Sequence, residues 1–120
     1  MHDQTQLRVV DIVGSGLCLF STDGQKVHDA IVAELREGRR VCLSFKGTEA
    51  LTAAFLNVGV GQLYGEFPGA QIRAKLSVAD ASQNDLVLLK RVVDRAKEFF
   101  ADPRQLQTVV KDLQGDDDEP

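Results

Sequence analysis

Side chains that carry chemistry are scarce in this sequence of 120 residues. There are two cysteines, Cys18 and Cys42, and two histidines, His2 and His28. Two cysteines do not form a disulfide framework, and without a CxxC pair or a histidine cluster they do not form a metal site. We interpret both cysteines as small core hydrophobes and His28 as a surface or packing residue. The alternative is that the protein is an enzyme that uses one of these two thiols.

Long apolar runs and nucleotide-binding motifs are also missing. Charges or glycines interrupt every apolar stretch well before the ~20 residues that a membrane-spanning helix needs. The N-terminus lacks the basic start and apolar core of a signal peptide, so we expect a cytoplasmic protein that does not associate with membranes. Neither a GxxxxGK(S/T) phosphate loop nor a GxGxxG dinucleotide motif follows a strand. The sequence therefore predicts a protein that is not an enzyme and needs no cofactor or metal.

The net charge of −4 comes entirely from the C-terminal end of the chain. Residues 1–100 carry 12 basic and 12 acidic side chains, whereas residues 101–120 carry two basic and six acidic ones, including the run from Asp116 to Glu119. Such a terminal run is typical of a solvated, disordered tail, and an arm that docks on a basic partner is the alternative. A neutral body without a basic stripe argues against nucleic acid as a partner.

Hydrophobic periodicity and turn residues predict an α/β fold. We expect strands over residues 6–13, 17–20, 40–45 and 71–78, with helices over 24–37, 52–67 and 82–100 and a short helix over 103–113. The first two strands would form a hairpin around Gly14-Ser15-Gly16. The order β-β-α-β-α-β-α predicts a small mixed β-sheet of about four strands with helices packed on it, over residues 1–102. Residues 103–120 would hold the short helix and the disordered acidic tail.

The predicted helix over residues 52–67 is unusual because it contains three glycines. Its apolar stripe consists of Leu56, Val60, Leu63 and Phe67. Inside a helix, a glycine costs about 1 kcal/mol relative to alanine. We interpret Gly59, Gly61 and Gly65 as small residues that let this helix approach the sheet closely. Close approach of a partner or ligand to the same helix is the alternative.

The segment before this helix, residues 46–52, joins the C-terminal end of a strand to a helix N-terminus. Ligands bind at this place in doubly wound sheets, and a helix N-terminus attracts anions. Thr52 can act simply as the N-cap of the helix, or its hydroxyl can be phosphorylated and so switch a docking surface. A nucleotide or small-anion sensor that binds at the helix N-terminus near Thr52 is therefore one functional hypothesis.

The strand, loop and helix from Val41 to Phe67, VCLSFKGTEALTAAFLNVGVGQLYGEF, resemble the central segment of the STAS-like domains of unknown function. Those domains share an apolar strand, an F-x-G turn and a T-x-x-F-L-N helix start, which stand here at residues 45–47 and 52–57. They look like relatives of the STAS domains of anti-sigma-factor antagonists, whose corresponding loop reads roughly D-S-S-G-L. The resemblance covers about residues 5–100.

This resemblance implies a small regulatory module that is not an enzyme. STAS antagonists bind a kinase-like anti-sigma factor, which switches them off by phosphorylating the first serine of the loop. Ala53 and Ala54 face that serine pair, and Thr52 stands where the antagonists usually have aspartate. We therefore expect docking on a protein partner, such as a GHKL-type ATPase or kinase, through the loop and helix of residues 47–62. The expected contact residues are Gly47, Thr48, Glu49, Thr52, Ala53 and Asn57. A homodimer through a free sheet edge is a further option.

Overall fold

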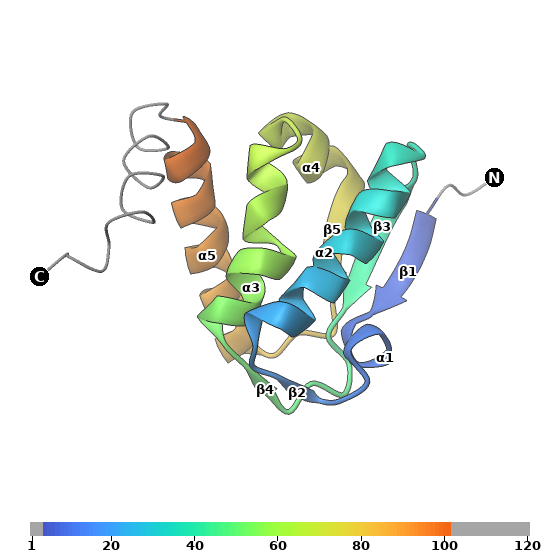
Figure 1. Ribbon diagram of the computed structural model, residues 1–120, viewed down its shortest axis with the longest axis vertical. Helices are drawn as coiled ribbons and strands as arrows, with labels where there is room; N and C mark the ends of the chain where they lie inside the picture. The colour runs from blue at the N-terminus through green and yellow to red at the C-terminus, as the bar shows by residue number, and fades with distance from the viewer. Residues whose placement is uncertain (1–3, 102–120) are drawn as a thin grey trace, which may run out of the picture.

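Three parallel strands form the main sheet of the protein, whose structure is a computed structural model that describes residues 4–101. Leu43 of the central strand lies between Leu7 and Val78 of its neighbours, and both Leu43 and Val41 are fully buried. The strand order is β1-β3-β5, with bounds β1 Gln4–Arg8, β3 Arg40–Ser44 and β5 Leu76–Ala79 (Figure 1).

Helices cover one face of this sheet. They are α2 Ser21–Arg36, α3 Ala53–Gly59, the 3-10 helix η1 Gly61–Gly65, α4 Gly69–Lys75 and α5 Gln83–Ala101. α2 contacts β1 and β3, α4 contacts β3 and β5, and α5 packs mainly against α3 and η1 (Figure 1). The opposite face of the sheet carries Gln6, Cys42 and Ser77 side by side, and the first and last of these are exposed.

A second, two-stranded parallel sheet lies at the end of the molecule where the strands of the main sheet finish (Figure 1). It pairs β2 (Leu17–Cys18) with β4 (Ala50–Leu51). A short helix, α1 (Val9–Val13), leads from β1 toward β2. It ends at Gly14, whose φ of 87° is left-handed, as helix-terminating glycines commonly are.

The packing of α2 on α3 depends on two glycines. A Cβ atom on Gly24 of α2 would collide with the carbonyl oxygen of Phe55, and one on Gly59 of α3 would lie 3.4 Å from the carbonyl oxygen of Gly24. The first contact is a collision with a backbone atom, which cannot move aside as the end of a flexible side chain can, whereas the second is an ordinary van der Waals contact. The two helices therefore meet backbone to backbone at this point.

His28 links α2 to the end of η1. Its side chain is buried, and its Nε2 lies 2.9 Å from Oε2 of Glu66. Its Nδ1 lies 3.2 Å from Oδ1 of Asp29 and 3.3 Å from Nε2 of Gln25. Both ring nitrogens have hydrogen-bonding partners. Of the two roles expected for His28, a surface residue or a packing residue, the structure confirms the packing role.

The α/β class is confirmed, whereas the predicted N-terminal hairpin is wrong. β1 ends at Arg8, and residues 9–13, expected to continue the strand, form α1. β2 pairs with β4 and not with β1, and every strand pair within residues 4–101 is parallel, so neither sheet is mixed. The β-branched residues of 9–13 favour a strand locally, but Val9 reaches the core from a helical turn, and this burial outweighs the local preference.

The helix expected over residues 52–67 is interrupted. It breaks at Val60, which has φ of −120°, into α3 and η1. The three glycines do allow close packing, but against other helices and not against the sheet. Gly59 faces α2, whereas a Cβ on Gly61 would lie 3.6 Å from Val92 and one on Gly65 would lie 2.5 Å from Phe100, both on α5.

The strand expected over residues 71–78 is wrong in its first half, which is helical. α4 occupies its first part, and β5 begins only at Leu76. The alternation of Ile72, Leu76 and Val78 fits a strand, but Ile72 is also four residues from Leu76, and it is buried from within α4. The helix predicted over 24–37 and the strand predicted over 40–45 are confirmed as α2 and β3, and Val27, Ile31 and Leu35 are buried as expected.

Several expectations fall outside the described residues. These are the short helix over 103–113, the acidic tail and the surroundings of His2, so the proposed domain bounds of 1–102 stay a prediction. Among the helices of residues 4–101, none is both long enough and apolar enough to cross a bilayer.

The glycine contact between α2 and α3 leads to a stability prediction. We expect Gly24→Ala to lower the free energy of unfolding by about 2–3 kcal/mol, because the added methyl group collides with a fixed backbone oxygen. The matched control is Gly59→Ala, where a 3.4 Å contact is offset by the higher helix propensity of alanine, so the change should stay within about 1 kcal/mol. Urea unfolding measures both. Equal effects of the two substitutions would contradict the backbone-to-backbone contact.

Candidate functional site

The loop from Lys46 to Thr52 begins with a tight turn at the end of β3. The N–H of Thr48 donates to the carbonyl oxygen of Phe45 (3.0 Å), and Gly47, at the third position of the turn, has φ of 87°. A positive φ at that position is the mark of a type II turn and favours glycine. Gly47 is therefore required by the shape of the loop.

Backbone hydrogen bonds fix the rest of the loop on the segment that contains β2. The N–H groups of Glu49 and Ala50 both donate to the carbonyl oxygen of Gly16 (2.8 and 3.2 Å). The N–H of Thr52 donates to the carbonyl oxygen of Cys18 (3.2 Å). The loop and its neighbouring segment are thus held in a defined shape.

Thr52 is the N-cap of α3, as one of the two interpretations of this residue predicts. Its Oγ1 accepts a hydrogen bond from the N–H of Phe55 (3.2 Å) and donates one to the carbonyl oxygen of Leu19 (2.7 Å). Phosphorylation of Thr52 stays a prediction, and it would have to break the bond to Leu19. The anion-sensor hypothesis also stays a prediction, and the N–H of Phe55 already has a partner in this cap.

The expected contact residues lie together but differ in exposure. Glu49, Ala53, Ala54 and Asn57 are exposed, Gly47 is exposed at the turn, and Thr48 and Thr52 are partly buried. The hydroxyl oxygen of Thr48 is buried, and it has no hydrogen-bond partner within residues 4–101. Whether these residues bind a partner stays a prediction.

The structure adds apolar residues that the sequence analysis missed. The exposed large hydrophobic side chains of residues 4–101 are Leu17 (49% exposed), Phe20 (64%), Leu86 (41%) and Val87 (49%). They lie in β2, at the N-cap of α2 and in the first two turns of α5. The N-terminal ends of α2, α3 and α5 all lie beside β2 and β4 at one end of the molecule (Figure 1). We name these four side chains the apolar end surface.

The starts of α2 and α5 each bring a carboxylate close enough to act on Cys18 of β2. Burial raises the pKa of the Cys18 thiol, and the carboxylates of Asp23, in α2, and Asp85, in α5, raise it further. Two carboxylates from different helices therefore act on the same buried sulfur. A thiol in such surroundings stays protonated at neutral pH, which makes it a poor nucleophile.

A groove between α3 and α5 continues from the loop. A hollow of about 240 Å³ is lined by Ala53 and Asn57 of α3 and, on α5, by Leu88, Arg91, Val92 and Arg95. Asn57 and Arg95 also line the neighbouring hollow of about 270 Å³, which reaches Phe99 and Phe100. Arg91 and Arg95 therefore stand along one side of the surface that includes the predicted residues Ala53 and Asn57.

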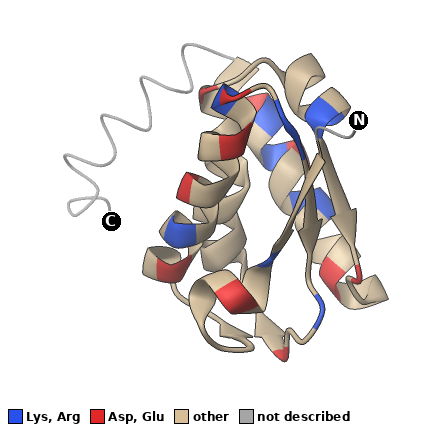
Figure 2. Cartoon of the chain, turned by 90° about the vertical axis from the view of Figure 1, so that its right-hand side faces the viewer, with Lys and Arg blue, Asp and Glu red and all other residues tan. Residues whose placement is uncertain are grey.

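The charged residues visible in Figure 2 do not form a patch of one sign that would indicate a second binding surface. Figure 2 shows ribbon segments coloured for basic and for acidic residues interspersed along the helices in that view. Some of them pair: Lys90 Nζ lies 2.9 Å from Asp94 Oδ2, and Lys26 Nζ lies 3.4 Å from Asp23 Oδ1. Within residues 4–101, no three histidine, cysteine or acidic side chains gather in a way that could hold a metal ion.

The missed residues leave a signal in the sequence. Leu17 and Phe20 belong to the run LCLF, and Leu86 and Val87 to the run LVLL. Four consecutive apolar residues cannot all face the core from one side of a strand or helix, so each run must expose some of them. The location of the two runs at one end of the molecule, however, depends on the tertiary fold.

The double hydrogen bond of Thr52 leads to a prediction about the loop. Thr52→Ala should lower the free energy of unfolding by about 1–2 kcal/mol, because it removes the helix cap and the partner of the Leu19 carbonyl oxygen. The control, Thr52→Ser, keeps the hydroxyl and should retain most of the stability. Thermal and urea unfolding test the pair, and equal losses for alanine and serine would show that the hydroxyl does not act as the cap.

The unpartnered hydroxyl of Thr48 leads to the opposite prediction. Thr48→Val replaces a buried polar atom with a methyl group of similar size, so we expect the free energy of unfolding to rise by about 1 kcal/mol. Thr48→Ser, which keeps the hydroxyl and loses the methyl group, is the control and should be less stable than the native protein. A valine variant that is less stable than the native protein would show that the hydroxyl is hydrogen-bonded.

Comparison with known protein families gives one match. The family model described as STAS-like domain of unknown function (DUF4325) matches residues 23–86. The matched segment begins in the first turn of α2, ends in the first turns of α5 and contains the whole loop described above. Neither the comparison with curated proteins nor that with solved structures gave a match. Since the family model covers more than half of the chain, the protein belongs to the STAS-like domains of unknown function.

Proposed function

We propose that this STAS-like domain is a regulatory module that binds a protein partner and is not an enzyme. The docking surface consists of the apolar end surface together with the loop of residues 46–52 and the exposed start of α3. The observation that carries this proposal is that the elements bearing the exposed side chains of Leu17, Phe20, Leu86 and Val87, namely β2 and the starts of α2 and α5, lie at the same end of the molecule as that loop (Figure 1). Exposed apolar side chains rimmed by polar residues are typical of protein interaction sites.

The preformed loop supports the proposal because it gives the docking surface a fixed shape. Glu49 and Asn57 are exposed and can hydrogen-bond to a partner around the apolar residues. Phe20, as an exposed aromatic residue, is the strongest candidate for an energetic anchor, since aromatic residues dominate binding energy at interfaces.

A GHKL-type ATPase or kinase is the partner class that we propose. The basis is the resemblance of this chain to anti-sigma-factor antagonists, which bind such proteins through the corresponding loop and helix. Ala53 and Ala54 have no hydroxyl groups, so a switch on the serine pair of those antagonists does not operate at these positions. We therefore propose that docking here does not require that pair.

The test compares two double variants that add the same charge. Phe20→Glu with Leu86→Glu alters the apolar end surface, and Ala33→Glu with Ala74→Glu alters exposed positions on α2 and α4 away from it. We expect the first pair to weaken partner binding by about 100-fold or more, because a desolvated carboxylate replaces an apolar contact at two positions. The control pair should bind like the native protein.

The partner is identified by affinity purification from the source organism followed by mass spectrometry, and its affinity is then measured with purified components. A partner with an ATP-binding domain of the GHKL type supports the partner class. Equal binding by both double variants would overturn the docking surface, and a partner without such a domain would overturn the partner class.

A further inference from the structure

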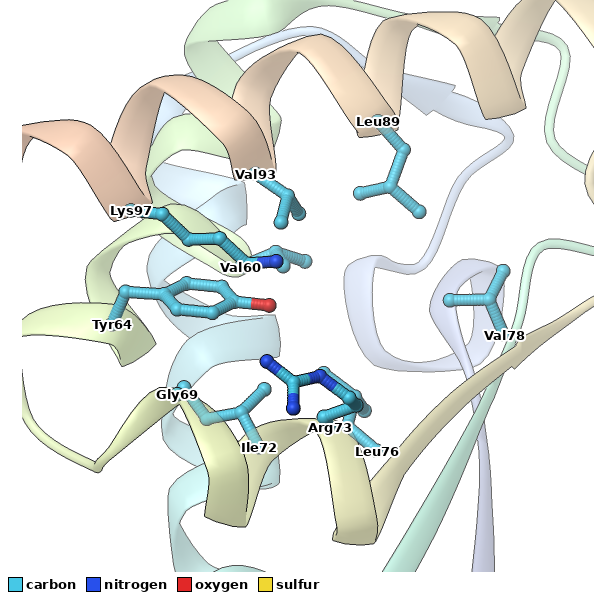
Figure 3. Close-up of a pocket in the computed structure, with 10 residues that line it drawn as sticks. All are labelled: Val60, Tyr64, Gly69, Ile72, Arg73, Leu76, Val78, Leu89, Val93 and Lys97. Carbon is cyan, nitrogen blue, oxygen red and sulfur yellow. The ribbon is translucent and has the colours of Figure 1, made fainter.

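A cavity of about 210 Å³ lies between α4, α5, η1 and β5, apart from the proposed docking surface (Figure 3). Apolar side chains make up most of its wall, namely Val60, Ile72, Leu76, Val78, Leu89 and Val93. The polar side chains that line it are Tyr64, Arg73 and Lys97. No residue of the apolar end surface lines the cavity, so its occupant need not be the docking partner.

The polar ends gather on one side of this cavity. In Figure 3 the hydroxyl of Tyr64 points into the cavity, and the guanidinium of Arg73 and the ammonium of Lys97 lie on either side of it in that view. The side chains of Val78 and Leu89 lie across the cavity from them. The cavity therefore has a cationic, hydrogen-bonding side and an apolar side.

The polar groups of the cavity are available to a ligand. Within the described part of the chain, neither Arg73 nor Lys97 forms an ion pair, and the hydroxyl of Tyr64 has no hydrogen-bond partner. Burial raises the pKa of Tyr64, the charge of Arg73 lowers it, and Asp94 raises it, so the phenol stays a proton donor at neutral pH. Asp94 itself is paired with Lys90.

We propose that this cavity binds a small organic carboxylate with a short apolar body. The carboxylate would accept hydrogen bonds from Arg73, Tyr64 and Lys97, and the apolar body would lie against Leu89, Val93 and Val78. A guanidinium matches a carboxylate in both charge and geometry. A cavity of about 210 Å³ is smaller than the roughly 300–1,000 Å³ of pockets that hold drug-sized ligands, so it suits a small molecule.

The test is an NMR titration of the full chain, labelled with ¹⁵N, with defined probes. The probes are hexanoate and benzoate, their uncharged counterparts hexanamide and benzamide, and inorganic phosphate. We expect saturable shifts for the two carboxylates at the backbone amides of Gly69, Ile72 and Val93. Hexanamide and benzamide lack the negative charge, and phosphate lacks the apolar body. We therefore expect all three to bind at least about tenfold more weakly than the carboxylates.

Variants assign the binding to this cavity. Arg73→Gln and Lys97→Gln change exposed side chains, so the fold should persist, and each should weaken carboxylate binding by about tenfold. Tyr64→Phe keeps the ring and should weaken binding by a smaller factor. The matched control is Arg91→Gln, which removes an arginine from α5 on the side that lines the groove toward α3.

Three results would overturn the proposal. The first is the absence of saturable shifts with either carboxylate. The second is equal binding of phosphate or of the uncharged amides, which would mean that one side of the cavity does not take part. The third is a larger loss with Arg91→Gln than with Arg73→Gln, which would place the anion site in the other groove. Because the cavity shares no residue with the apolar end surface, none of these results bears on partner docking.

Discussion

The backbone-to-backbone contact between α2 and α3 is the constraint on which the rest of the molecule depends. No side chain fits at Gly24, because the carbonyl oxygen of Phe55 occupies the place where a Cβ atom would be. This contact holds the start of α3 beside the start of α2, where Thr52 reaches the carbonyl oxygen of Leu19 and where Phe20 is left exposed. The shape of the proposed docking surface thus follows from a packing contact in the interior.

One face of the main sheet is uncovered because α5 packs on the helices that cover the other face. Parallel sheets are usually covered on both faces, yet the outward side at Gln6 and Ser77 is polar and exposed. α5, whose buried residues are Leu89 and Val92, accordingly packs against α3 and η1, on the side of the sheet that already carries helices. Two hollows remain along the sides of α5. One is the groove between α5 and α3, and the other is the cavity between α5, η1, α4 and β5.

The elements with one clear hydrophobic period could be predicted from the sequence, and those whose apolar pattern fits both a strand and a helix could not. α2, β3 and α5 lie within a few residues of their expected bounds. The strand prediction is wrong for residues 9–13 and 71–75, because their apolar residues fit a strand locally but are buried from helical turns. The pairing of β2 with β4 joins segments about thirty residues apart, and nothing local indicates it. The turn glycine and the cap residue of the loop could be predicted because they have specific local roles, whereas the position of β2 and the starts of α2 and α5 at one end of the molecule depends on the tertiary fold.

One edge of α5 takes part in both proposals. Leu86, Leu89, Val93 and Lys97 follow one another at spacings of three and four, so they lie along one side of the helix. The first belongs to the apolar end surface, and the other three line the cavity. A carboxylate in the cavity would change docking only if α5 has two positions and the ligand binds one of them more tightly. Leu17 and Phe20 lie outside the elements that line the cavity. A shift of α5 would therefore move Leu86 and Val87 relative to Leu17 and Phe20 and so change the shape of the docking surface.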